Sequence, residues 1–310
     1  MKQKKRPWTA ADSQISVLAV PTTVWFLLFS YLPMFGVIIA FKRYRINGGF
    51  LRSLITSDWA GLHYFRLLFN NEDVWIALRN TLAYNGVMLV VGTFLTIGLA
   101  LLVSELHSKA KAKVYQTLMF FPHFLSWVVV TALVWGFLSH ERGIVNSVLV
   151  SMGHERFSFY MEPRFWPGFL VFLSQWKSVG FGMIIYLATI TALDKEVYEA
   201  ALIDGASKWK QITRITIPMM KTIIVLLFIL NVGRIFFSDF GLFFQVPRDA
   251  SALRDVTTTL DVFVFRQLMT VATPIGMTAA AALFQSVTAL ILTLTANKIV
   301  SKIDAESAMI

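Results

Sequence analysis

Long apolar runs alternate with shorter polar segments along almost the whole chain. Six of these runs reach about 20 residues or more, the length that a helix rising about 1.5 Å per residue needs to cross a hydrocarbon layer of roughly 30 Å. The runs are Ile15–Phe41, Ile76–Val103, Val114–Leu138, Phe165–Ala192, Met219–Phe240 and Ile275–Val300. The pattern predicts an all-α integral membrane protein with six transmembrane helices, which form one membrane domain over residues 15–300.

The composition supports the bilayer as the solvent of this chain. Of its 310 residues, 56% are hydrophobic and only 15% are charged, which is too little polar surface for a water-soluble globule of this size. Cysteine is absent, which excludes disulfides, thiolate metal sites and cysteine catalysis. The five histidines are scattered over different segments, so we predict no catalytic residue and no metal site.

The net charge of +10 is explained by membrane topology rather than by nucleic acid, because most basic residues lie between the apolar runs. With the N-terminus in the cytoplasm, the inner segments are residues 1–14, 105–113, 194–217 and 301–310. The first outer segment and its borders are also basic, so the charge bias alone leaves the orientation open. These residues are Lys42, Arg43, Arg45, Arg52, Arg66 and Arg79. An even number of spans places both termini on the same side of the membrane, which we expect to be the cytoplasm.

A polar stretch between the fourth and fifth apolar runs has the pattern of two short helices around a glycine. Good helix formers fill Val197–Ile203, and Gly205 is a natural stop because it accepts a left-handed backbone. Ser207 can cap a second helix, which we expect to run to about Arg214. Pro218 then falls in the first turn of the next predicted span, where a proline is tolerated.

The side chains of the first short helix suit a protein partner better than a lipid surface. Ala200 and Ala201 leave one side of it nearly free of bulk, while Glu199 and Asp204 add charge. A helix that only lay on lipid needs large apolar residues on that side. We therefore expect this helix to insert into a groove of another protein.

The same stretch resembles the cytoplasmic signature of the permease subunits of binding-protein-dependent ABC importers. The matching positions are Glu199, Ala200, Ala201, Gly205, Ile215 and Pro218, with Ile217 where leucine is usual. Secondary matches at residues 59–62, 79–82 and 296–298 are similar to the sugar-permease branch. Residues 239–248 look like those of permeases for complex oligosaccharides.

The resemblance implies a machine with several subunits in the bacterial cytoplasmic membrane. A second related permease, two cytoplasmic ATPase subunits and an extracytoplasmic solute-binding protein would complete it, and an oligosaccharide would be the cargo. The segment 194–217 would be the coupling helix that sits on an ATPase subunit. The chain has no Gly-x-x-x-x-Gly-Lys-Ser/Thr motif, so we expect no cofactor in it and no enzymatic activity of its own. ATP and Mg would be bound by the partner ATPase subunits.

Polar residues inside the apolar runs are candidates for the substrate path, because ionisable groups are costly within a membrane. Glycans are usually held by an aromatic ring together with amide or charged groups. The candidates of these types are Gln175, Trp176, Lys177, Asn231, Arg234, Asp239 and Gln285. The alternative is that Lys177 and Arg234 reach towards a membrane interface or pair across helices, with Asp239 as the partner.

Two further questions stay open in the sequence. Arg234, Arg248, Arg254 and Arg266 fit an anionic cargo such as uronate-containing oligosaccharides, but docking of an acidic binding protein explains the same charges. The alternative function is an ion- or proton-coupled secondary transporter. That class predicts inverted repeats and paired acidic residues near the membrane centre. The apolar runs show no repeat and scarcely any buried carboxylate.

Overall fold

The computed structural model describes residues 9–270 and 273–303, and the chain is mostly helical, at 78%. Much of the two predicted cytoplasmic tails, residues 1–8 and 304–310, lies outside the described residues. The all-helical prediction needs one correction. Strands β1 (Lys42–Arg43) and β2 (Asp58–Trp59) pair in an antiparallel ladder, with Lys42 opposite Trp59.

The described residues form two compact units. The first lies within Met1–Asn70 and Thr270–Leu283, and the second within Asn71–Met269 and Phe284–Ile310. The long helix α15, Ile275–Ile303, therefore contributes its beginning to the first unit and the rest to the second. That residues 15–300 act together as one membrane domain stays a prediction.

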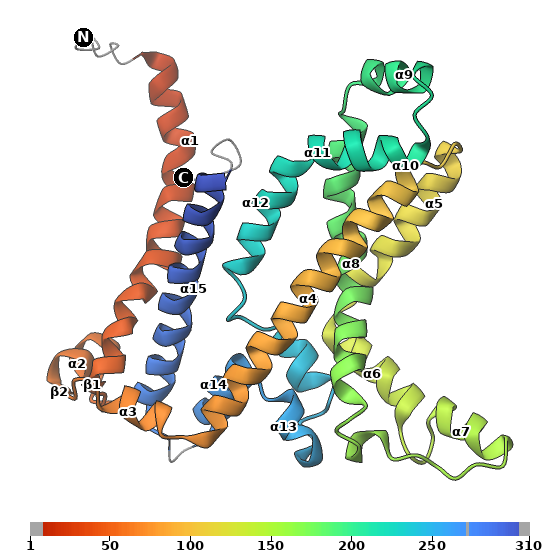
Figure 1. The fold of residues 1–310 in the computed structure, drawn as a ribbon. Coiled ribbons are helices and arrows are strands. Elements are labelled where there is room, and N and C mark those ends of the chain that lie inside the picture. Colours follow the sequence, from red (N-terminus) through yellow and green to blue (C-terminus); the bar gives the residue numbers. More distant parts are fainter. Residues whose placement is uncertain (1–8, 271–272, 304–310) are drawn as a thin grey trace. The chain divides into compact units, whose positions relative to one another are not determined.

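The first unit begins with α1, Ala10–Phe26, which continues through a π turn and a 3₁₀ segment, Leu32–Phe41 (Figure 1). The helical winding changes close to Pro33, which lacks the N–H group that an α-helix requires. Two short helices follow, α2 (Phe50–Thr56) and α3 (His63–Phe69).

The second unit is built on two long helices, α4 (Glu72–Ser104) and α8 (Trp166–Thr191), which pack along each other. A glycine permits the close approach. A Cβ atom added at Gly182 would lie 2.7 Å from Cγ2 of Thr96. Such small residues are the usual means of bringing helices together in membranes.

The third apolar run is not one straight helix. It comprises α5 (Lys109–Phe120), a 3₁₀ turn (Phe121–Phe124) and α6 (Trp127–Leu138), with a bend of 96° between the two parts. Pro122 lies in the 3₁₀ turn, and Ser126 caps α6 by accepting a hydrogen bond from the Val129 N–H at 3.3 Å. The third predicted span is therefore broken at the 3₁₀ turn that contains Pro122, although its apolar composition continues through the break.

The fifth apolar run also differs from its predicted bounds. Helix α10 (Lys208–Gln211) continues through a π turn into α11 (Ile217–Met219), so Pro218 lies near the end of this helix instead of in the first turn of the next. Helix α12 (Lys221–Val232) starts after a 61° bend, and the chain leaves the helix before Arg234. The second short helix thus extends past Arg214, and the predicted span is too long at its C-terminal end.

The number of spans follows from these breaks. Four helical stretches of the described chain are long and apolar enough to cross a membrane: Ser13–Phe41, Glu72–Ser104, Trp166–Thr191 and Ile275–Lys302. The count rises to six if each bent pair is one span. The structure therefore supports a helical membrane fold with four to six candidate spans.

The connections between α6 and α8 and after α12 are short helices and turns. Helix α7 (Ile144–Ser151) and a 3₁₀ turn at Phe159–Met161 lie between α6 and α8. After α12 come a π turn (Gly241–Gln245), a 3₁₀ turn (Ser251–Leu253), α13 (Arg254–Thr257) and α14 (Leu260–Met269).

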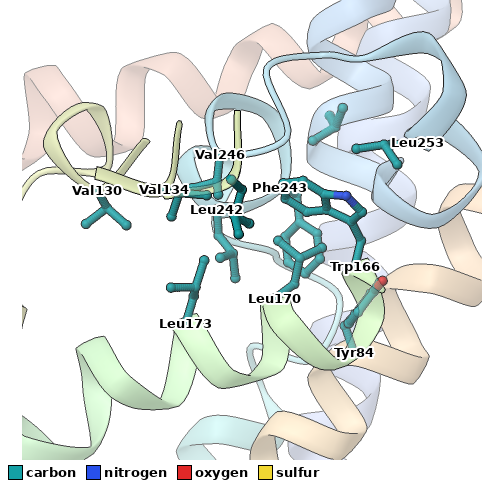
Figure 2. Close-up of a cluster of buried hydrophobic side chains, with 12 residues drawn as sticks. Tyr84, Val130, Val134, Trp166, Leu170, Leu173, Leu242, Phe243, Val246 and Leu253 are labelled. Carbon is teal, nitrogen blue, oxygen red and sulfur yellow. The ribbon is translucent and has the colours of Figure 1, made fainter. Parts of the chain in front are cut away.

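A hydrophobic core fixes these connections to the long helices (Figure 2). Trp166 and Leu170 of α8 are completely buried, and the indole N–H of Trp166 donates to the Phe159 carbonyl at 2.8 Å. Leu242 and Phe243 pack into the same cluster from the π turn after α12. The non-helical segment after α12 is therefore held on a rigid base.

Candidate functional site

A cavity of about 600 Å³ lies within the second unit. Its walls come from the middle of α4, from α8, from the end of α12 and from the non-helical segment 234–239 with the start of the following π turn. Polar wall residues include Asn85, Thr93, Thr96, Ser174, Gln175, Ser178, Asn231, Arg234, Ser238 and Asp239. Phe181 and Phe237 add aromatic surface.

The non-helical segment is fixed by hydrogen bonds to its backbone. The Asn85 amide donates to the carbonyls of Ile235 and Phe237, at 2.7 and 3.0 Å. The Ser238 N–H donates to the Asp261 carboxylate at 2.6 Å. The Gln285 amide donates to the Phe236 carbonyl at 2.5 Å, so three separate helices hold this stretch of wall.

Asp239 is fully engaged by its own surroundings. Its Oδ2 accepts a hydrogen bond from Nε1 of Trp127 at 2.6 Å, and its Oδ1 accepts one from the Gly241 N–H at 3.1 Å. Gly241 is needed for this contact, since a Cβ atom there would overlap the Trp127 ring. Asp239 is therefore held against the start of α6.

Arg234 and Gln175 contribute polar groups to the wall that lack hydrogen-bond partners among the described residues. The guanidinium of Arg234 makes no hydrogen bond or ion pair with the residues that the structure describes. Gln175 is only 7% exposed; its Nε2 donates to the Met88 carbonyl at 3.3 Å, while its Oε1 has no partner in the described chain. Oε1 lies close to Gly92, where an added Cβ atom would be 2.9 Å away.

The structure thus brings four predicted path residues together and leaves three outside. Gln175, Asn231, Arg234 and Asp239 line the cavity. Trp176, Lys177 and Gln285 are not on its wall.

Lys177 has a structural environment of its own. Its ammonium donates to the His123 carbonyl at 3.0 Å and lies 5.3 Å from the centre of the Trp127 ring. Neither Lys177 nor Arg234 pairs with Asp239 within the part of the chain that is described. The predicted pairing across helices with Asp239 is therefore wrong, although Lys177 does bridge two helices through a backbone carbonyl and a ring.

The other arginines after α12 belong to a structural cluster. The Asp249 carboxylate forms ion pairs with the guanidinium groups of Arg266 and Arg254, at N···O distances of 2.5 and 3.6 Å. Arg248 places its guanidinium 4.0 Å from the centre of the Trp135 ring. Arg248 and Asp249 have φ angles of 57° and 47°, a backbone that non-glycine residues rarely adopt. Their charges hold this strained turn together.

Tyr160 lies beside the same turn. Its hydroxyl donates to the Val246 carbonyl at 3.4 Å, and its ring packs edge-on against Trp135 with centroids 5.1 Å apart. Burial raises the pKa of Tyr160 to about 12, although the positive charge of Arg248 works in the opposite direction.

The polar segment between α8 and α12 has the predicted helix, glycine turn and helix. Helix α9 spans Lys195–Ile203, and Asp194 caps it by accepting a hydrogen bond from the Glu196 N–H at 3.0 Å. Gly205 follows with a φ of 73°, and Ser207 caps the next helix. The local prediction is confirmed.

The glycine turn is closed by two backbone hydrogen bonds. The Ala206 N–H donates to the Ala201 carbonyl at 2.9 Å, and the Gly205 N–H donates to the Leu202 carbonyl at 3.0 Å. This pair is the Schellman arrangement, which satisfies the free carbonyls at a helix end. The turn after α9 is therefore specified by local sequence.

Helix α9 has no buried residue, so its surface is available. Of the residues singled out in this stretch of the sequence, Glu199, Ala200, Asp204, Gly205 and Pro218 are exposed, and Ala201 and Ile215 are half-buried. Large apolar side chains accompany them: Leu202 is 66% exposed, Ile203 87% and Trp209 73%. Exposure of these three side chains is not among the features predicted above, although large apolar residues within a polar segment are the signal for it.

Two side-chain contacts attach this segment to the rest of the second unit. Lys208 forms an ion pair of 2.9 Å with Glu105 at the end of α4. The hydroxyl groups of Tyr198 and Thr216 lie within hydrogen-bonding distance, at 2.9 Å. These contacts connect the α9–α10 segment to α4 and to the helix that leads into α12.

The fold and the α9–α10 segment define a transport protein of one class. The chain belongs to the family of binding-protein-dependent transport system inner membrane components, whose sequence profile matches residues 92–301. The matched region contains the α9–α10 segment and all of the cavity wall except Asn85, Met88 and Leu89. The permease family predicted from the signature is confirmed.

Individual relatives cover nearly the whole chain. The chain is 35% identical over 303 residues to Protein LplB of Bacillus subtilis (strain 168), covering 96% of this chain and 93% of the relative. It is 33% identical to the polygalacturonan/rhamnogalacturonan transport system permease protein YteP of the same organism, covering 94% and 88%. Among solved structures, a bacterial ABC transporter involved in the import of the acidic polysaccharide alginate matches with a TM-score of 0.83 and 32% identity, covering 95% and 97%.

Proposed function

We propose that this chain is the permease subunit of an ATP-driven importer, and that it carries oligosaccharides from an extracytoplasmic binding protein into a bacterial cytoplasm. The observation that carries the proposal is the cavity of about 600 Å³ in a chain whose relatives are named for polygalacturonan, rhamnogalacturonan and alginate. The volume is within the usual range of ligand pockets, roughly 300–1,000 Å³.

The cavity wall has the chemistry that a sugar requires. Ser174, Ser178 and Asn231 offer hydroxyl and amide groups for hydrogen bonds to sugar hydroxyls. Phe237 lines the cavity and is 42% exposed, so its flat face is free for the apolar side of a sugar ring. Gln175, Asn231, Arg234 and Asp239 are the predicted path residues that this proposal retains.

The α9–α10 segment is proposed as the site that receives the mechanical input. Its exposed Leu202, Ile203 and Trp209 supply apolar area for a protein groove, and Glu199 supplies a charge beside them. The partner is a cytoplasmic ATPase subunit that binds ATP and Mg. Closure of two such subunits moves α9, and the contacts of Lys208 and Tyr198 pass the motion to the helices around the cavity.

The complete assembly has this chain, a second related permease, two ATPase subunits and the binding protein. It lies in the cytoplasmic (inner) membrane, with both termini of this chain in the cytoplasm. Oligosaccharides with uronate residues are included in the proposed cargo. The rival function, an ion-coupled transporter, needs paired acidic residues, and the one carboxylate among the described cavity residues is engaged by Trp127 and Gly241.

Transport by the assembled complex in proteoliposomes tests the proposal. We expect uptake of a labelled oligogalacturonate only when both ATP and the loaded binding protein are present. Uptake driven by a proton or sodium gradient without ATP supports the rival function and rejects this one.

A further inference from the structure

The cavity has one basic side chain among its described lining residues, and that side chain has no partner. Arg234 lines the cavity, and its guanidinium forms neither an ion pair nor a hydrogen bond with the described residues. A guanidinium presents five N–H donors in a planar fork that matches a carboxylate. Arg234 is therefore equipped for a ligand with a negative charge.

The acidic residue of the same wall is held by other groups. Both carboxylate oxygens of Asp239 accept hydrogen bonds, from the Trp127 indole at 2.6 Å and from the Gly241 N–H at 3.1 Å. These donors stabilise the charge of Asp239 where it is. They leave Arg234 without a partner among the residues that the structure describes.

The neighbouring arginines cannot serve the cavity in this way. Arg254 and Arg266 are paired with Asp249, and Arg248 lies over Trp135. None of the three lines the cavity. Of the four arginines that fit an anionic cargo in the sequence, Arg234 alone is on the wall.

Gln175 provides a second, independent sign of a ligand. This side chain is more than nine-tenths buried and lies on the cavity wall, and its Oε1 has no hydrogen-bond partner in the described chain. A buried acceptor without a partner is rare and requires an explanation. A sugar hydroxyl that donates to this amide supplies one.

We propose that Arg234 is the specificity residue by which this permease prefers sugars with a free carboxylate, and that Trp127 is a positioning residue that keeps Asp239 from pairing with Arg234. The inference rests on the transport function proposed above. A carboxylate that binds Arg234 gains charge-assisted, two-point hydrogen bonds, which a neutral sugar of the same shape lacks.

The test compares a negatively charged cargo with its neutral methyl ester. Trigalacturonate and its fully methyl-esterified form have the same sugar chain, and uptake of each is measured with the complete complex and saturating binding protein. The ratio of the two uptake rates is then compared between wild type and variants, so that the preference of the binding protein itself cancels.

We expect Arg234→Gln to lower the acid-to-ester ratio by about tenfold or more, with Arg234→Lys in between. Arg142→Gln, at an exposed position in the turn before α7, is the matched control and keeps the wild-type ratio.

The role of Trp127 has its own readout. Trp127→Phe removes the indole donor, so Asp239 becomes free to neutralise Arg234 and the ratio falls. Adding Asp239→Asn removes the competing carboxylate, and we expect the double variant to regain the acid preference. A purely structural role for Trp127 predicts no such rescue.

The outcomes separate this inference from the proposed function. If the wild-type complex transports neither cargo with ATP, the proposed function fails. If it transports both cargoes and Arg234→Gln keeps the wild-type ratio, the proposed transport function is supported and the assignment of Arg234 is wrong. The same conclusion follows if Arg234→Gln reduces both uptake rates equally.

Discussion

The indole of Trp127 and the carboxylate of Asp239 join two breaks in the helical framework, with Nε1 donating to Oδ2 at 2.6 Å. Trp127 is the first residue of α6, directly after the 96° bend of the third apolar run. Asp239 lies in the non-helical segment that follows α12 and lines the cavity. This hydrogen bond therefore joins the cavity wall to the start of α6, at the bend of the third apolar run.

Close packing of α5 against α8 predicts a large cost for a single methyl group. A Cβ atom at Gly180 would overlap the Met119 carbonyl, which is backbone and cannot rotate away. We expect Gly180→Ala to destabilise the protein by about 1–3 kcal/mol or more, measured as a lower thermal unfolding midpoint in detergent. Gly168→Ala in the same helix meets no atom within 4 Å and is the control. Equal midpoints for the two variants would refute the packing.

A milder glycine substitution should affect transport more than stability. A Cβ atom at Gly92 would lie 2.9 Å from Oε1 of Gln175, the end of a flexible side chain that can move. We expect Gly92→Ala to change stability by less than about 1 kcal/mol and to reduce oligosaccharide uptake several-fold, because the amide is displaced. Gly98→Ala, with no atom within 4 Å, keeps normal uptake. Normal uptake in both variants argues against a role for Gln175.

The raised pKa of Tyr160 predicts a pH dependence at the alkaline end. The pKa of Tyr160 is about 12 in the folded protein and 10.0 in the unfolded chain, so folding favours the neutral phenol. The contribution of this group to stability is therefore fully present below about pH 10. This contribution is lost as the pH rises through 12. Tyr160→Phe should lower the unfolding midpoint by the same amount at pH 6, 7 and 8, with a difference that shrinks above about pH 10. A difference that grows with pH contradicts the assignment.

Features set by neighbouring residues could be predicted from the sequence. The glycine turn after α9 depends on Gly205, on the caps at Asp194 and Ser207, and on bonds between residues at most five apart. Length and hydropathy likewise indicate α4 and α8. Local patterns contain this information, because helix ends and spans depend on nearby side chains.

Features set by distant contacts could not be predicted. Arg234 and Arg266 have the same chemistry in the sequence, but Arg266 pairs with Asp249, 17 residues away, whereas Arg234 faces the cavity. Lys177 reaches His123 across 54 positions of sequence. Hydropathy alone does not record backbone direction, and within the continuous third apolar run it is Pro122 that indicates the bend.

The α9 segment gives the most direct test of the proposed division between subunits, in which this chain forms the transport path and a partner hydrolyses ATP. ATP hydrolysis and oligosaccharide uptake are measured together in proteoliposomes with Glu199→Lys and Gly205→Pro. Both residues are exposed, and Gly205 has a φ of 73° that proline cannot adopt. Lys195→Gln, exposed on the same helix, is the control. We predict that uptake is lost in both variants, through uncoupled hydrolysis or dissociation of the ATPase, while the permease remains folded in the membrane. Normal ATP-dependent uptake with either substitution would contradict the proposed coupling role of α9.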